Sequence, residues 1–156
     1  MCNDVQDKVL DNEHFARWVY CPRFVDKNGE FNEKFISLRP NEEGISGQIF
    51  EKAGHDSILQ CGSKFRRTSK DGTDKEELFL GYVKAQTGEI RKIADEPNTS
   101  IDVVYTTSQS VPFHAEIRFY INEALLKGNN QNPYYLRYRK KLTNLFKQDF
   151  IQIKSA

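Results

Sequence analysis

The sequence predicts an α+β protein in which an antiparallel sheet of about five strands packs against a C-terminal amphipathic helix. Three observations support this fold. Residues 111–121, VPFHAEIRFYI, alternate apolar and polar side chains, as in a sheet with one buried face. Other aromatic and β-branched runs are bounded by turn residues. After Asn132-Pro133, apolar residues recur at three- and four-residue steps, which is the helical period.

The first predicted strand is the run FARWVYC at 15–21, which is aromatic and β-branched and stops at Pro22. Asn28-Gly29 is a strong hairpin signal, and it predicts a second strand near 35–38. The pattern over 45–54 is ambiguous. Its isoleucine and phenylalanine spacing suits a helix, whereas Gly44, Gly47 and Gly54 oppose a long one.

The middle of the chain predicts one short helix and a loop. Asp56 suits an N-cap, so we expect a helix near 56–67. Residues 66–77 are charged and contain glycine, which is typical of a mobile loop. The run at 77–84, ELFLGYVK, is then expected to be a strand.

The last third predicts two more strands and the long helix. TGEIRKIAD is expected to form a helical turn or two capped by Thr87. Strands follow at 101–108, which is β-branched and expected to be central in the sheet, and at 113–121. Asn132 as N-cap and Pro133 at the first helical position predict a helix start. The apolar stripe of that helix consists of Tyr135, Tyr138, Leu142, Leu145, Phe146 and Phe150.

Composition predicts one domain over residues 1–156, with 1–13 as a polar lead-in. Lys plus Arg number 23 against 22 Asp plus Glu, so the overall charge favours neither nucleic acid nor an anionic membrane. The three widely spaced cysteines suit reduced thiols in a cytoplasmic protein. We find no apolar stretch near the roughly 20 residues that cross a bilayer, so no membrane partner is expected.

Two histidines and an arginine suggest catalysis without a metal. His14, Arg17 and His114 could supply a general base, a general acid and a group that stabilises phosphate charge, as in a ribonuclease. Ser46 and Glu116 are further candidates for this site. The alternative is that these side chains are ordinary polar residues of a sheet surface. No residues show metal-ligand spacing, and no phosphate-binding glycine loop is present, so neither a metal nor another cofactor is expected.

A second candidate is single-stranded nucleic acid binding by the basic and aromatic run at 134–142. Arginines and lysines neutralise phosphates, and tyrosines stack on unpaired bases. The ordinary alternative is a solvated helix face, with part of its aromatics in the core. The residues proposed for this role are Tyr134, Arg137, Arg139, Lys140 and Lys141.

A third candidate is a binding module that recognises another protein. Interfaces concentrate aromatic residues and arginine, so exposed aromatics are expected there, namely Trp18, Tyr20, Tyr120 and Tyr134. Arg39, Glu42 and Arg118 would supply polar contacts. Core packing would explain many of the aromatics equally well.

Three short motifs resemble a family of small uncharacterised bacterial proteins. They read HFARWV from residue 14, LRPNEEGIS from residue 38 and PFHA from residue 112, against the family's H-x-x-R-Y-V, L-R-P-x-E-x-x-L-S and P-x-H-A. The resemblance covers most of residues 14–117 and departs after Ser46. It implies a shared polar site, and its matched positions are His14, Arg17, Arg39, Glu42, Ser46 and His114.

The sequence favours a small cytosolic bacterial binding module without catalysis, in an antitoxin, immunity or defence-type accessory role. A phosphate-handling enzyme using His14, Arg17 and His114 is the first alternative, and single-stranded nucleic acid binding is the second. A protein partner is expected before a nucleic acid, and the oligomeric state is open.

Overall fold

A computed structural model describes residues 8–66, 77–128 and 131–153, and it confirms the predicted α+β class. Residues 1–7 of the predicted lead-in and 67–76 of the predicted loop lie outside the described part. The elements follow in the order β1 (His14–Cys21), β2 (Ile45–Ile49), α1 (Phe50–Ala53), α2 (His55–Lys64), β3 (Leu78–Gln86), α3 (Thr87–Arg91), β4 (Thr99–Tyr105), β5 (His114–Ile121), β6 (Ala124–Leu125), α4 (Pro133–Phe146) and β7 (Phe150–Gln152).

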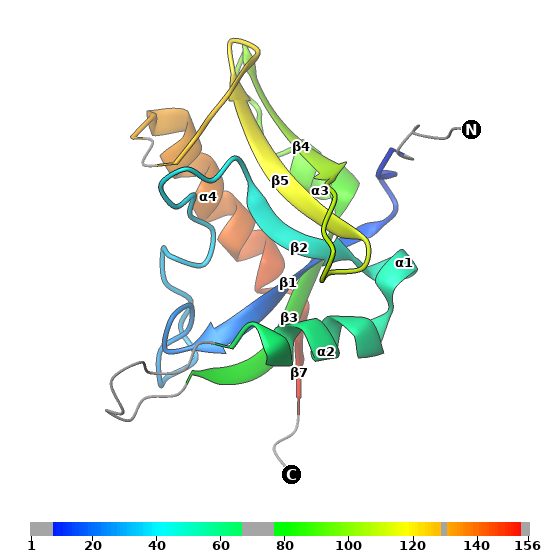
Figure 1. The fold of residues 1–156 in the computed structure, drawn as a ribbon. Coiled ribbons are helices and arrows are strands. Elements are labelled where there is room, and N and C mark those ends of the chain that lie inside the picture. The colour runs from blue at the N-terminus through cyan, green and yellow to red at the C-terminus, as the bar shows by residue number, and fades with distance from the viewer. Residues whose placement is uncertain (1–7, 67–76, 129–130, 154–156) are drawn as a thin grey trace, which may run out of the picture.

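The sheet is antiparallel, and within the described residues it has seven strands rather than about five. Its order is β4-β5-β2-β1-β3-β7, and β6 pairs with the end of β5. Figure 1 shows this arrangement, with β2 in the middle of the sheet. Strands from the two halves of the sequence are therefore neighbours along one continuous surface.

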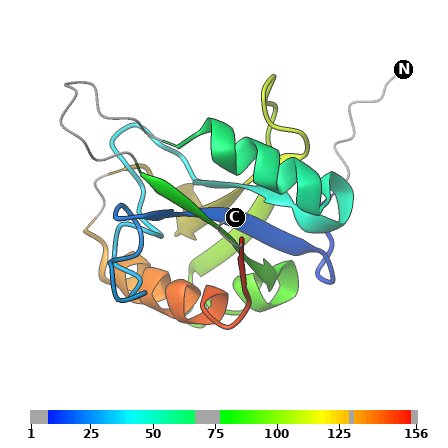
Figure 2. The ribbon, with the colours of Figure 1, turned by 90° about the horizontal axis from the view of Figure 1, so that it is seen from below.

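Helix α4 covers the apolar face of the sheet, as the alternation of 113–121 predicts. The ring of Phe119 lies 5.0 Å from that of Tyr135, and the ring of Phe15 lies 6.1 Å from that of Phe146, measured between centroids. All four side chains are buried. Figure 2 shows α4 on one side of the sheet and α2 on the other.

Helix α4 begins where the sequence predicts and ends earlier. The Asn132 side chain accepts a hydrogen bond of 2.9 Å from the backbone N–H of Tyr134, and Pro133 occupies the first turn. The helix ends at Phe146, so Phe150 of the predicted stripe belongs to β7 instead. The backbone reverses there and β7 pairs with β3.

Two predictions about the strands were wrong. Residues 35–38 form no strand, although Phe35, Ile36 and Leu38 are buried. Their burial comes from packing under α4: the backbone N–H of Leu38 donates to the Tyr135 hydroxyl over 2.8 Å. The strand predicted to be central, at 101–108, is β4 at the edge of the sheet, and the middle of the sheet holds β2, Ile45–Ile49, within the stretch whose pattern was ambiguous.

Two of the three predicted helix caps are also wrong. Gly54 is the N-cap of α2, so Asp56 lies in its first turn, and Gln86 is the N-cap of α3, so Thr87 lies inside that helix. Neither N-cap residue provides a side-chain hydrogen bond. Both short helices therefore depend on packing against the sheet more than on local capping.

Candidate functional site

Strands β1 and β2 separate soon after they meet, and Arg17 fills the gap between them. The strands pair at Phe15 with Ile49 and at Ala16 with Gln48. At the next position, the Arg17 side chain donates from Nη1 to the carbonyl oxygen of Ser46 over 2.7 Å. Its Nε donates to the carbonyl oxygen of Phe35 over 2.9 Å. One guanidinium therefore joins β1, β2 and the segment before β2.

The surroundings of Arg17 are apolar on one side and basic on the other. The centre of its guanidinium lies 5.0 Å from the ring centroid of Phe24 and 5.5 Å from that of Phe35. Burial lowers the pKa of Arg17 to about 10, while the Glu42 carboxylate acts in the opposite direction. Arg17 therefore stays protonated at neutral pH. Among the described residues, no carboxylate forms an ion pair with it.

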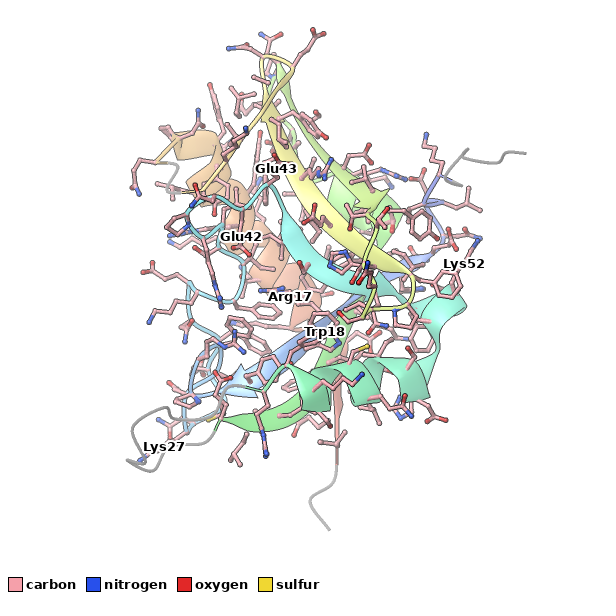
Figure 3. The ribbon with its side chains drawn as sticks, viewed as in Figure 1. Arg17, Trp18, Lys27, Glu42, Glu43 and Lys52 are labelled. Carbon is pink, nitrogen blue, oxygen red and sulfur yellow. The ribbon has the colours of Figure 1, made fainter. Side chains whose placement is uncertain are left out.

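A cavity of about 140 Å³ opens beside this guanidinium, and we refer to it as the Arg17 pocket. Trp18 and Phe65 form an aromatic wall, with ring centroids 5.6 Å apart. Figure 3 shows Arg17, Trp18 and Glu42 in the region where β1 and β2 separate. The polar lining consists of Arg17, Arg23, Ser37, Arg39, Glu42 and Ser46.

The charges of the pocket are partly neutralised. Arg23 forms two hydrogen bonds to Glu77, of 2.7 and 2.9 Å, so its charge is matched. Glu42 accepts from the backbone N–H of Arg39 over 2.7 Å, which directs its carboxylate toward the 39–42 turn. The side chain of Arg39 is exposed. Two guanidinium groups, Arg17 and Arg39, therefore stand against the single carboxylate of Glu42.

The three predicted catalytic residues have separate partners. His14 Nδ1 lies 2.6 Å from Glu51, and Glu51 also accepts from the backbone N–H of His14. Burial alone would raise the pKa of Glu51, but these hydrogen bonds lower it. His114 Nδ1 is hydrogen-bonded to the Thr106 hydroxyl. Because neighbouring residues of a strand alternate, Arg17 leaves β1 on the side opposite to His14.

The polar side chains on one face of β5 interact mainly with one another. Glu116 accepts from Arg118 over 3.0 Å, and Tyr120 lies on the same face of β5 because side chains alternate along a strand. Ser46 lies directly opposite Glu116 in the pairing of β2 with β5. These contacts bring Glu116, Arg118 and Tyr120 into one row, and Ser46 connects that row to the Arg17 pocket.

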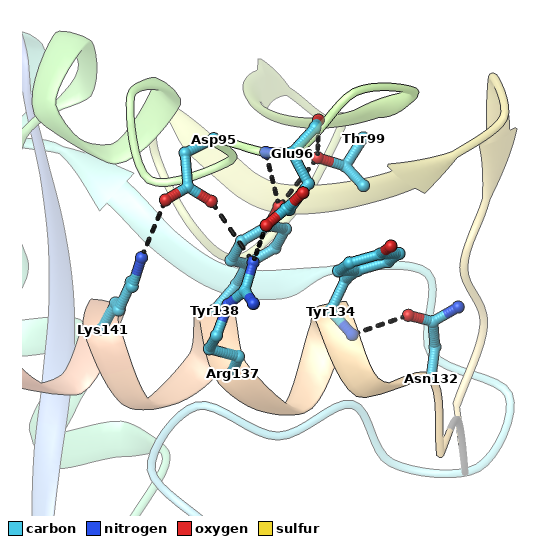
Figure 4. A network of polar contacts seen from close by, with 8 residues as sticks. All are labelled: Asp95, Glu96, Thr99, Asn132, Tyr134, Arg137, Tyr138 and Lys141. Atoms are coloured by element: carbon cyan, nitrogen blue, oxygen red, sulfur yellow. Dashed lines mark hydrogen bonds and ion pairs between the residues drawn. The ribbon is translucent and has the colours of Figure 1, made fainter.

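The basic face of α4 is largely paired with carboxylates. Arg137 contacts Glu96 at 3.0 Å and Lys141 contacts Asp95 at 3.1 Å, as Figure 4 shows. Arg139 contacts Glu33 at 3.3 Å. Lys140 is exposed and lines an open hollow of about 560 Å³ between α4 and residues 31–33. Phosphates would have to compete with these carboxylates for most of the predicted cations.

The aromatic residues predicted to be exposed differ in burial. Trp18 and Tyr20 are buried. The Nε1 of Trp18 donates to Gln48 over 3.3 Å beneath α2, and the Tyr20 hydroxyl donates to the carbonyl oxygen of Gly62 over 2.8 Å. Tyr138 of the α4 stripe is buried as well, with its hydroxyl accepting from the backbone N–H of Glu96. Tyr134 is 38% exposed, and Tyr120 is half-buried. Trp18 could therefore contact a partner only through the small part of its side chain that lines the Arg17 pocket.

Two negative observations concern the described part of the protein. It contains no group of three His, Cys, Asp or Glu side chains that could hold a metal ion. It also contains no helix whose length and apolarity would let it cross a membrane.

Cys21 and Cys61 are free thiols, and burial raises the pKa of Cys61.

Comparison with known families, with curated proteins and with solved structures finds no match to this chain. Of the six positions that carry the family resemblance, Arg17, Arg39, Glu42 and Ser46 line the Arg17 pocket. Sequence reasoning missed Ser37 and Arg23. Ser37 directly precedes the motif that contains Arg39, whereas Arg23 had no sequence signal.

The environment of His114 predicts a pH-dependent stability. Burial lowers its pKa, although the Glu116 carboxylate raises it in part. The folded protein then binds a proton at His114 less readily than the unfolded polypeptide, whose histidine pKa is about 6.5. The free energy of unfolding should fall as the pH drops below about 6.5, and His114→Gln should remove this part of the fall.

Urea unfolding at pH 7.5 and pH 5.5 checks this expectation, with His55→Gln as the matched control. His55 is exposed and hydrogen-bonded to Tyr82 on the α2 side. Equal pH dependence in the wild type and His114→Gln would contradict the prediction.

Proposed function

We propose that this protein is a non-catalytic binding module that recognises a partner protein through an anionic group held in the Arg17 pocket. The observation that carries the proposal is the half-buried Arg17 guanidinium. It is bound by two carbonyl oxygens and by no carboxylate of the described residues, and it borders a cavity. A partly buried positive charge without a direct ion pair is costly, and an anion in the cavity would offset that cost.

Arg17 also has donors to offer. A guanidinium carries five N–H hydrogens, and the carbonyl oxygens of Phe35 and Ser46 take two of them, which leaves three. Both hydrogens on Nη2 are among those three. A cavity of about 140 Å³ is smaller than the roughly 300 Å³ at which small-molecule pockets begin. The pocket therefore suits a single anchoring group of a larger partner.

The separation of the polar residues supports binding without catalysis. An acid–base pair needs both groups within hydrogen-bond reach of one reacting atom. His14 is engaged by Glu51, His114 by Thr106, and Arg17 by two backbone carbonyls. A phosphate-handling enzyme would need these contacts to rearrange. That alternative would be favoured if His14→Ala and His114→Ala each abolished a hydrolytic activity of a folded protein.

The biological setting remains part of the proposal. A cytoplasmic location is consistent with the free thiols of Cys21 and Cys61. An accessory role beside a partner, as in antitoxin, immunity or defence systems, agrees with a small module that offers an anchoring pocket. Single-stranded nucleic acid binding by α4 receives less support, because carboxylates already pair with Arg137, Arg139 and Lys141.

Anion-dependent stability tests the proposed function. Replacing chloride by acetate, sulfate or phosphate at constant ionic strength should raise the Tm of the wild type. For an anion with a Kd on the order of 10 mM, 100 mM should raise it by about 3–5 °C. The rise should be much smaller in Arg39→Gln, which removes an exposed guanidinium of the pocket.

Lys27→Gln serves as the matched control, because it removes one exposed positive charge away from the pocket, as Figure 3 shows. It should keep the full response. An equal rise in all three proteins, or no rise with any oxyanion, would overturn the proposal.

A further inference from the structure

We infer that the anion recognised by the Arg17 pocket is a carboxylate carried by the polypeptide of the partner. This inference rests on the proposed function and specifies its ligand. A carboxylate can come from an Asp or Glu side chain or from the C-terminus of a polypeptide, and the chemistry of recognition is the same for both. Charge, donor geometry and the rim of the pocket each favour it over phosphate.

The charge of the pocket suits an anion with a single negative charge. The charge of Arg23 is matched by Glu77 at 2.7 Å. Arg17 and Arg39 then face one carboxylate, Glu42, which acts on Arg17 strongly enough to oppose the effect of burial on its pKa. One uncompensated positive charge remains. A second negative charge on the ligand would be repelled by Glu42 without a further cation to bind it.

The donors of the pocket match two planar oxygens. The rings of Phe24 and Phe35 pack against the guanidinium of Arg17. This packing favours approach of a ligand along the guanidinium edge, where the Nη2 hydrogens lie. Planar, bidentate binding of that kind is the usual geometry between arginine and a carboxylate. The structure gives the hydroxyls of Ser37 and Ser46 no hydrogen-bond partner in the described ranges, so they can serve as further donors.

The rim of the pocket suits a polypeptide ligand. The cavity holds one functional group, so the rest of the ligand must lie outside it. Phe65 is 39% exposed there and packs against Trp18. An apolar residue next to the bound carboxylate would cover Phe65, and aromatic contacts of this type are common at protein interfaces.

The first experiment compares anions on the wild-type protein. The ¹⁵N-labelled side-chain Nε–Hε signal of Arg17 is followed during titration with sodium acetate and with inorganic phosphate at constant ionic strength. We expect acetate to shift the signal in a saturable way and to bind at least as tightly as phosphate. Tighter phosphate binding would overturn the carboxylate inference and leave anion recognition standing. No saturable shift with either anion would overturn both.

The second experiment locates the source of the carboxylate. Three short probes are compared: acetyl-Ala-Phe with a free C-terminus, acetyl-Ala-Phe amide, and acetyl-Asp-Phe amide. Binding of either carboxylate-bearing probe at least 10-fold tighter than the neutral amide supports the inference and shows which source the pocket accepts. Equal binding of all three probes would overturn it.

A charge variant adds an independent readout. Glu42→Gln removes the carboxylate that opposes a second negative charge, so phosphate affinity should rise relative to acetate by about 5–10-fold. Glu43→Gln is the matched control, because Glu43 is exposed and faces Lys127 at 3.9 Å instead of lining the pocket. An unchanged ratio in Glu42→Gln would contradict the role assigned to Glu42.

Discussion

Replacing Phe146 with alanine is expected to lower the free energy of unfolding by about 3–5 kcal/mol. Phe146 has no exposed surface, and its ring contacts Phe15 of β1 and Phe35 at centroid distances of 6.1 Å each. The substitution would leave a cavity where α4 meets the sheet. Because the carbonyl oxygen of Phe35 accepts from Arg17, the pocket should also weaken.

Urea unfolding followed by circular dichroism measures this loss, and the anion titration measures the effect on the pocket. Asn144→Ala is the control on the same helix, because Asn144 is exposed and its substitution should change stability by less than about 0.5 kcal/mol. A loss under about 1 kcal/mol for Phe146→Ala would mean that α4 does not seal the apolar face.

Arg17→Gln is expected to lower the free energy of unfolding by about 2–4 kcal/mol and to abolish the stabilisation by oxyanions. The substitution leaves the carbonyl oxygens of Phe35 and Ser46 without their donor, and each buried unpaired acceptor costs about 1–3 kcal/mol. Relief of the buried charge reduces the loss but does not cancel it.

Arg39→Gln separates the structural contribution from the binding contribution. Arg39 is exposed, so its substitution should leave stability in chloride within about 0.5 kcal/mol of the wild type while reducing the response to acetate. Arg17→Lys keeps the charge without the planar fork, and it should fold better than Arg17→Gln yet bind acetate poorly. Full acetate binding by Arg17→Lys would contradict the bidentate geometry.

Local sequence patterns predicted the elements that are defined by residues close together in the sequence. The alternation of 113–121 set the buried face of β5, and Asn132-Pro133 set the start of α4. Strand β2 lacked such a pattern because of Gly47. A Cβ at this position would meet the carbonyl oxygen of Ala16 at 2.3 Å and the Phe15 ring at 2.5 Å. The glycine that removes the strand signal is thus required by the packing of β2 against β1.

The candidate site was predicted only in part, for a related reason. The motif residues Arg17, Arg39, Glu42 and Ser46 were singled out from the sequence, but they were grouped with two histidines that have other partners. Residue types indicate which chemistry is possible. They do not indicate which residues of a distant strand a side chain will meet, because that depends on a strand register that is unknown from the sequence.

The sequence by itself therefore determined the fold class, the apolar face and the cap of the last helix, because these depend on residues a few positions apart. The tertiary structure alone decided where β1 and β2 separate. The Arg17 side chain bridges the resulting gap by bonding to carbonyls 18 and 29 positions away in the sequence. Contacts at that separation depend on how distant segments pair and pack, and no local periodicity encodes them.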